Sequence, residues 1–458
     1  MKHTRRDLLR YSACGLLGRA AFISGFDRFS MVSAMAAPAA PPSDYKALVC
    51  IFMFGGNDSN NMIVPLDNYA NYATNRGVLA LTQAQLLPIT TKSLVKYGLH
   101  PNLTATPPNQ TSLFSLFQSG ALAVVANVGT LTAPIKKSDY LAGTHPNQLF
   151  SHSDQQAQWQ TSVSTANSPT GWGGRVADLT QNTGATFPAV CSVAGVSVFS
   201  IGANAQPIAL APAPTPLNQT LRLVKPDAGI QQILSIDQNA AAPTLVRASD
   251  NITQFALNNS ALLSSNPTLT TVFPTTGLGN QLNQVAKLIS LRTSLSLKRQ
   301  IFFCSIGGFD THTVQLSTQS SLMQQLSDAM AAFYNATLEL GVSSQVTTFT
   351  LSDFSRTFKP AGSAAATVGS DHAWGSHHFV MGDAVNGREF YGAFPDLAVG
   401  GNQDADSGSG ARGRWIPTTS VDEYAARLAS WYGVSNGDLP LAFPNIGRFA
   451  MANLGFMM

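Results

Sequence analysis

Long apolar runs constrain the fold of this chain more than any other feature of its sequence. Residues 47–54 read Ala-Leu-Val-Cys-Ile-Phe-Met-Phe, and residues 121–128, 301–306 and 346–351 form similar runs interrupted only by Asn, Ser or Thr. A strand with one face in water alternates polar and apolar side chains, whereas a strand buried on both faces does not. The runs therefore predict the buried, mostly parallel sheet of an α/β protein.

The segments between these runs have the pattern of helices that cover a sheet. Apolar side chains recur every three to four residues over 278–289 and again over 322–337, which is the spacing of an amphipathic helix. Strands that alternate with such helices make parallel crossover units. We therefore predict a three-layer α/β/α sandwich in a single domain, residues 37–458. A stretch around 195–275, rich in Ala, Asn, Gln, Ser, Thr and Pro, is predicted to be a polar insertion at its periphery.

Residues 1–36 have the features of a twin-arginine export signal. Residues 4–10 read Thr-Arg-Arg-Asp-Leu-Leu-Arg, a weakly apolar stretch follows, and Ala34-Met35-Ala36 offers a small-residue cleavage site. The apolar stretch is too short and too rich in Gly and Ser to predict a transmembrane anchor. We therefore expect a periplasmic or secreted protein that is exported in its folded state.

The net charge argues against a nucleic-acid-binding protein. The whole chain has a formal charge of +3, but residues 1–36 contribute six basic and two acidic residues, a net of +4. Without them the charge is −1. Proteins that bind nucleic acids concentrate Lys and Arg on their surface, so no nucleic-acid partner is expected. The sequence leaves protein partners open.

Three aspartates follow apolar runs within a few residues. Asp58, Asp310 and Asp353 hold these positions, and His312 lies two residues after Asp310. Because the carboxyl ends of parallel strands meet at one edge of a sheet, we expect these side chains to lie close together. Carboxylates and imidazoles are ligands of divalent metals. All four residues are therefore predicted metal ligands, for zinc, calcium, magnesium or manganese.

The segment 369–378 adds further ligands, since it holds three of the eight histidines of the chain. His372 is predicted to bind the metal, and Asp371 is either a second ligand or the group that orients His372. Neighbouring residues of an extended segment point in opposite directions. We therefore expect one of His377 and His378 to face the metal and the other to point away.

Three residues are predicted to act in catalysis. Ser151 and His152 belong to the loop that follows the second apolar run, from which they would line the site opposite the metal ligands. Arg356 could bind the anionic group of a substrate through two parallel hydrogen bonds. A surface salt bridge is an equally good explanation of Arg356.

Taken together, the motifs of this chain resemble those of the DUF1501 family of exported bacterial proteins, over residues from about 47 to 433. The motifs are Gly55-Gly56-Asn57-Asp58, Gly307-Gly308-Phe309-Asp310-Thr311-His312, Ser352-Asp353-Phe354-Ser355-Arg356-Thr357 and Gly369-Ser370-Asp371-His372. The family is related to the alkaline phosphatase and sulfatase superfamily. The resemblance implies an alkaline-phosphatase-like fold and hydrolysis of phosphate or sulfate esters at a pair of metal ions.

The resemblance also implies roles for individual residues. Asp58 and Asp353 stand for the acids that end two strands, and Asp310 with His312 for the paired ligands of one metal. His372, with His377 or His378, would complete the set. Two positions depart from the superfamily: one residue separates Asp310 from His312 where three are usual, and Phe354 replaces a histidine. The candidates for a nucleophile are Ser59, Ser151 and Ser153.

These observations predict an exported metal-dependent hydrolase whose substrate is a small anionic ester or a glycan-linked one. One alternative is a binding or assembly protein without enzymatic activity on a degenerate hydrolase scaffold. Another is a serine esterase that needs no metal, because Asn57 and Asp58 after two glycines resemble one motif of such enzymes.

Overall fold

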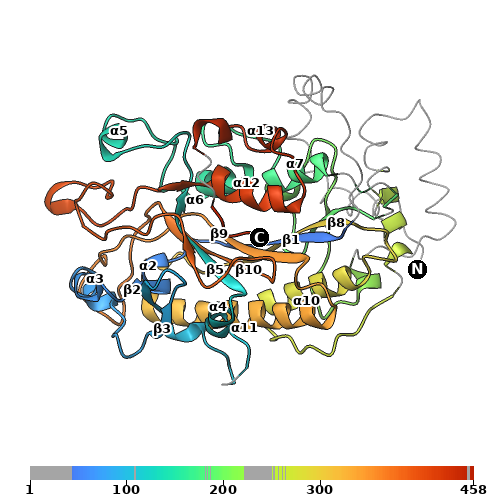
Figure 1. Cartoon of the computed structure of the whole chain (residues 1–458), viewed down its shortest axis with the longest axis horizontal. Helices are drawn as coiled ribbons and strands as arrows, with labels where there is room; N and C mark the ends of the chain where they lie inside the picture. Colours follow the sequence, from blue (N-terminus) through green and yellow to red (C-terminus); the bar gives the residue numbers. More distant parts are fainter. Residues whose placement is uncertain are drawn as a thin grey trace, which may run out of the picture.

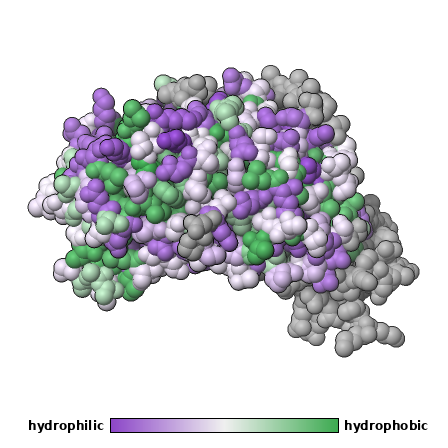
Figure 2. Space-filling view, turned by 60° about the horizontal axis from the view of Figure 1, so that its bottom comes forward, coloured by the Kyte–Doolittle hydropathy of each residue, from purple (hydrophilic) through white to green (hydrophobic). Residues whose placement is uncertain are grey.

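The computed structural model describes residues 44–458 except 108–109, 181, 183, 186, 221–249, 251–252, 256, 260, 264 and 451–453. The predicted export signal and much of the predicted insertion around 195–275 lie outside the described residues. None of the described helices is long and apolar enough to cross a membrane. On the face shown in Figure 2, hydrophobic and hydrophilic residues are interspersed.

A twisted sheet forms the centre of the molecule (Figure 1), with the strand order β11-β5-β10-β9-β1-β8-β6-β7 and β12 beside β5. Strand β10 is antiparallel to β5 and β9, and the other pairings described in this sheet are parallel. The bounds of its strands are β1 Lys46–Met53, β5 Leu122–Gly129, β6 Val190–Ser192, β7 Ile208–Ala209, β8 Arg299–Ile306, β9 Val346–Ser352, β10 Ser376–Met381, β11 Phe390–Tyr391 and β12 Thr419–Ser420. All four apolar runs are thus strands of one mostly parallel sheet, as predicted.

Helices cover both faces of this sheet (Figure 1). On one face lie α4 Leu113–Ser119, α10 Gly277–Ser290 and α11 Gln315–Glu339, and on the other α6 His152–Thr161, α7 Trp172–Leu179, α12 Val421–Tyr432 and α13 Leu439–Ala442. Alternate residues of β1 belong to two separate hydrophobic cores, Val49 and Ile51 to one and Leu48 and Cys50 to the other. The three-layer α/β/α sandwich is therefore confirmed.

Smaller elements lie around the sandwich. A second sheet has the order β2-β4-β3. The bounds of these elements are α2 Ser59–Met62, β2 Ile63–Pro65, α3 Tyr69–Arg76, β3 Leu87–Thr90, β4 Lys96–Leu99 and α5 Lys137–Leu141.

The strand register brings three loops to one edge of the sheet. Met53, the last residue of β1, pairs with Ile306 at the end of β8 and with Ser352 at the end of β9. The chain leaves β1 through Gly55, whose φ is +111° and where a Cβ atom would lie 2.3 Å from the backbone nitrogen of Asp310. Only glycine fits so close an approach, so the loops after β1 and β8 are in direct contact.

His377 and His378, which were predicted as metal ligands, lie within β10 and are buried in the two cores. His377 Nδ1 accepts a hydrogen bond of 3.0 Å from the backbone N–H of Asn127. The ring of His378 packs between Trp159 and Tyr424, with centroid separations of 4.8 and 5.9 Å. The two side chains do point to opposite faces, but each packs among core side chains, and we leave both out of the site proposed below.

Burial lowers the pKa of both His377 and His378 to about 3. The folded protein therefore keeps them neutral, while the unfolded chain protonates them below about pH 6.5. Because the unfolded state binds more protons, the free energy of unfolding falls as the pH drops from about 6.5 towards 3. We predict that His378→Phe reduces this pH dependence by about 1.4 kcal/mol per pH unit within that window. Urea denaturation at a series of pH values measures the slope, and an unchanged slope would contradict the prediction.

Candidate metal centre

Three imidazoles and one carboxylate converge at the edge of the sheet. Nε2 of His372 lies 3.1 Å from Nε2 of His152 and 2.9 Å from Nε2 of His312. Oδ1 of Asp310 lies 3.4, 3.1 and 3.4 Å from the Nε2 atoms of His152, His312 and His372. Ligand atoms around tetrahedral zinc, with bonds of about 2.0–2.1 Å, are about 3.3 Å apart. Three of these side chains, His152, Asp310 and His372, have ligand atoms that all lie within 4.8 Å of one another, as ligands around one cation would, and His312 contacts two of the three.

Three segments that are distant in the sequence supply this cluster. His152 is the first residue of α6, Asp310 and His312 lie in the loop after β8, and His372 lies between β9 and β10. The backbone of His372 forms an isolated antiparallel bridge with Arg356, which follows β9. Sheet register and this bridge therefore place the ligands together.

Each histidine has an oxygen at its other ring nitrogen. Nδ1 of His152 lies 2.7 Å from Oδ2 of Asp353, Nδ1 of His372 lies 2.7 Å from the carbonyl oxygen of Phe150, and Nδ1 of His312 lies 3.3 Å from Oδ1 of Asp371. Carbonyl and carboxylate oxygens can only accept, so we assign the hydrogen of each neutral ring to Nδ1. The three Nε2 lone pairs then point at one another and at the carboxylate of Asp310. This arrangement is repulsive unless a positive charge, that of a metal ion or of a proton on one of the rings, lies among them.

The charges around the cluster keep Asp310 ionised. Burial alone would raise its pKa, but the hydrogen bond and charge of Arg356, with Nη1 2.7 Å from Oδ1, hold the pKa of Asp310 below its usual value. The hydrogen bond to Asp353 raises the pKa of His152, whereas burial lowers the pKa of His372. The carboxylate therefore contributes a full negative charge to the place where the imidazole lone pairs meet.

The cluster is open to solvent on one side. The side chain of Asp310 is 47% exposed and that of His312 is 44% exposed, whereas His152 and His372 are more enclosed, at 28% and 23%. Catalytic zinc sites keep one position open for water or substrate, while structural sites are closed by protein ligands. If His152, His372 and Asp310 hold the ion, one tetrahedral position stays free on the exposed side, beside His312.

Two predicted ligands, Asp353 and Asp371, lie behind the histidines. Asp353 is fully buried, and its carboxylate accepts hydrogen bonds from Gln156 at 2.8 Å and from the backbone N–H of Gly55 at 3.2 Å, besides contacting His152. Asp371 contacts His312 with one oxygen and Arg412 with the other, at 2.9 Å. Such groups fix the orientation of the imidazoles and raise their basicity.

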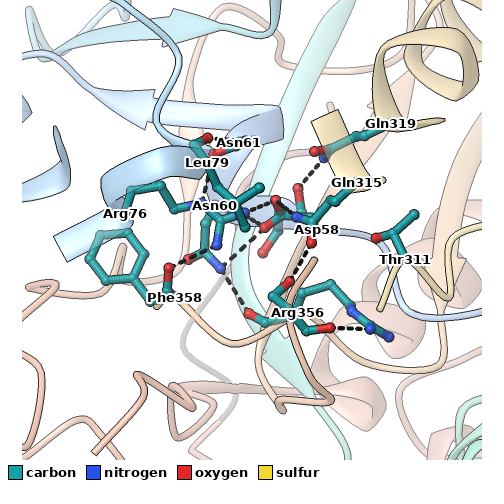
Figure 3. Close-up of polar contacts among 12 residues, drawn as sticks. Asp58, Asn60, Asn61, Arg76, Leu79, Thr311, Gln315, Gln319, Arg356 and Phe358 are labelled. Carbon is teal, nitrogen blue, oxygen red and sulfur yellow. Dashed lines mark hydrogen bonds and ion pairs between the residues drawn. The ribbon is translucent and has the colours of Figure 1, made fainter. Parts of the chain in front are cut away.

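The third strand-end acid, Asp58, lies apart from the cluster. Its carboxylate is buried and forms an ion pair with Arg76, and it also accepts a hydrogen bond of 2.5 Å from Gln315 (Figure 3). The resemblance implied a pair of metal ions. The residues at the cluster fit one ion, while the carboxylate of Asp58 is already occupied by a guanidinium.

The other predicted catalytic residues are also engaged. The hydroxyl of Ser151 donates to Oδ2 of Asp154 at 2.5 Å and lies 3.3 Å from the hydroxyl of Ser153. Arg356 is fully buried, and it donates to Asp310 and to the carbonyl oxygen of Ser370. Its guanidinium therefore links Asp310 to the backbone of Ser370 at this edge and does not project towards a substrate.

Sequence reasoning assigned one member of the cluster a different role and missed another group. His152 was predicted to be catalytic, yet its Nε2 is among the converging atoms. The carbonyl oxygen of Phe150 orients His372, and a backbone carbonyl leaves no signature in a sequence. The position of His152 at the start of a helix after a strand was the available signal for its placement.

The family described as "Protein of unknown function (DUF1501)" matches residues 45–406, and the chain belongs to it. No curated protein matches the chain. The structure of Ps i-CgsB in complex with k-i-k-neocarrahexaose is similar with a TM-score of 0.32 and 6% identity, covering 87% of this chain and 74% of that one. A second similar structure is the PsFucS1 sulfatase from Pseudoalteromonas sp., with a TM-score of 0.32 and 8% identity, covering 96% of this chain and 74% of that one. At this level of similarity we draw no conclusion about activity.

The contact between Asp353 and His152 gives a test of the centre. Asp353→Asn removes the charge that holds the Nδ1 hydrogen of His152 in place, so we predict a zinc affinity lower by roughly ten- to a hundredfold. Competition against a chromophoric chelator measures the affinity. Asp178→Asn is the matched control, because the hydrogen bonds that Asp178 accepts from described residues all come from backbone N–H groups of residues 203–205, away from the cluster. Equal affinities for the wild type and Asp353→Asn would refute the role of Asp353.

Proposed function

We propose that this protein is an exported metal-dependent hydrolase of phosphate or sulfate esters. The observation that carries the proposal is the convergence of three Nε2 atoms and one ionised carboxylate oxygen on the solvent side of the sheet edge, where five of their separations are 2.9–3.4 Å. The neutral imidazoles and the carboxylate repel one another unless a positive charge lies among them, and a divalent metal ion supplies that charge. The export signal predicted in residues 1–36 would place the reaction outside the cytoplasm.

The donor atoms favour zinc among the metals that the sequence left open. Magnesium and calcium prefer oxygen ligands throughout, whereas three imidazole nitrogens with one carboxylate oxygen suit zinc and its neighbours in the first transition series. We therefore propose His152, His372 and Asp310 as the three ligands, His312 as a further donor beside the open position, and Asp353 and Asp371 as the groups that orient two of the histidines.

A divalent ion bound there would supply Lewis acidity, which acidifies water and polarises an ester oxygen. The remaining work falls to residues of the chain. Arg356 keeps Asp310 ionised and in place, and the oxygens at Nδ1 keep the imidazoles in the tautomer that binds metal. Arg412 is 28% exposed and adjoins the cluster through Asp371. We propose that Arg412, rather than the buried Arg356, attracts the anionic group of the substrate.

The substrate class follows from this charge arrangement. A bound divalent ion, together with Arg412, would make the open side of the centre electropositive, which favours an anionic ester over a neutral one. A small phosphate or sulfate ester fits that requirement, and so does an ester group on a glycan. The ester group would contact the centre, and the group attached to it would extend into solvent.

Turnover of aryl phosphates and aryl sulfates tests the proposal. We predict that the zinc-loaded protein hydrolyses at least one of the two, and that a chelator abolishes this activity and added zinc restores it. His372→Ala and Asp310→Asn should each lower kcat/KM by at least about a hundredfold, because each removes a metal ligand. Asp438→Asn provides the control, since Asp438 pairs with Ser435 at the surface.

Two results would refute the proposal. The first is purified protein that binds no divalent metal and whose ester hydrolysis resists chelators. The second is covalent labelling of Ser151 by a fluorophosphonate probe together with loss of activity in Ser151→Ala, which would instead establish the serine esterase.

A further inference from the structure

A buried ion pair lies behind the metal centre. The side chains of Asp58 and Arg76 are 1% and 0% exposed. Besides Asp58, the guanidinium of Arg76 donates to the side chain of Asn61 at 2.9 Å and to the carbonyl oxygens of residues 357 and 358 at 2.9 and 2.8 Å (Figure 3). Arg76 is thus held in one position by partners from two different segments of the chain.

Asp58 has no acceptor position left for a metal ion. One carboxylate oxygen accepts from the backbone and side-chain N–H groups of Asn60, at 3.2 and 3.3 Å. The other accepts from Arg76 and from Gln315. A buried carboxylate needs a compensating positive charge, and here the guanidinium of Arg76 provides it.

A chain of hydrogen bonds connects this pair with the metal centre. Gln315 donates to Asp58 at 2.5 Å and accepts from the hydroxyl of Ser370 at 2.6 Å. The carbonyl oxygen of Ser370 accepts from Arg356, which also donates to Asp310. Gln315, Ser370 and Arg356 are all fully buried. Because the interior around them is close-packed, a displacement of Asp58 would be passed along this series of hydrogen bonds to Asp310.

We propose that Arg76 is a built-in cation that neutralises Asp58 in place of a second metal ion, so that each chain binds a single ion at the centre. We further propose that the Arg76–Asp58 pair is a positioning element, which holds Arg356 and Asp310 in place through Gln315 and Ser370. This inference rests on the proposed function, because it concerns the same centre. Replacement of a buried ion pair by apolar residues is often neutral for stability, so stability alone does not account for the pair.

The number of ions bound is the first test. Titration of the metal-free protein with Co²⁺, followed by its visible absorption and by calorimetry, should give one ion per chain with the intense bands of tetrahedral cobalt. Two ions per chain would overturn this inference and leave the proposed function standing. Binding of no ion would overturn the proposed function itself.

The second test separates positioning from simple structural support. Arg76→Met should lower Co²⁺ affinity by about tenfold or more and alter the absorption bands, whereas Arg76→Lys, which keeps the positive charge but loses the planar donor group, should lose less affinity than Arg76→Met. Arg299→Met is the matched control, because Arg299 is a buried arginine whose ion pair with Asp44 lies at the opposite end of β8. It should leave both the affinity and the spectrum unchanged.

A double variant covers the case in which Arg76→Met does not fold. Asp58→Asn combined with Arg76→Met leaves no unpaired buried charge, and we expect it to fold, to bind one Co²⁺ and to show the same weakened affinity of about tenfold. Wild-type affinity and an unchanged spectrum, in Arg76→Met or in the double variant, would overturn the positioning role.

Discussion

The burial of β1 between β8 and β9 is the constraint on which the rest of the structure depends. The strand contributes alternate side chains to two cores, and its parallel register with both neighbours ends all three strands at the same level. Because the loops that follow parallel strands begin at one edge of the sheet, the residues after β1, β8 and β9 lie close together. The candidate metal centre, the carboxylates beside it and the Arg76–Asp58 pair all lie in or against these loops.

Electrostatics then divides the acids at this edge into different roles. Asp310 is the most exposed of the three strand-end acids and lies among imidazole lone pairs, Asp353 is buried behind His152, and Asp58 is neutralised by a guanidinium. A solvent-exposed carboxylate is stable without a metal ion, whereas a buried carboxylate needs a compensating positive charge in the folded protein. Depth below the surface therefore decides which acid is free to bind a metal and which becomes part of the framework.

The resemblance to a family and the pattern of apolar runs predicted the layers, the mostly parallel sheet and the edge at which polar residues gather. The apolar runs do so through local composition, since a strand buried on both faces must be apolar along its length, and the resemblance does so through its motifs. Asp310 and His312 could be predicted to lie at this edge because they follow a buried strand. His372 could be predicted to join them because it belongs to a segment rich in potential metal ligands. The placement of His377 and His378 could not, because the segment after His372 re-enters the sheet as the antiparallel strand β10 and carries both rings into the cores.

The sequence by itself determined the α/β/α class and the acids that follow β1, β8 and β9, because hydrophobic burial and strand direction act through residue type and order. Tertiary structure alone decided that His152 of α6 joins the cluster, that the carbonyl oxygen of Phe150 orients His372, and that Arg76 occupies Asp58. These contacts join residues separated by 18 to 222 positions. Each of these contacts forms between polar atoms that still lack a partner when the layers pack. Which atoms those are depends on distances in space, and the spacing of residues in the sequence does not encode such distances.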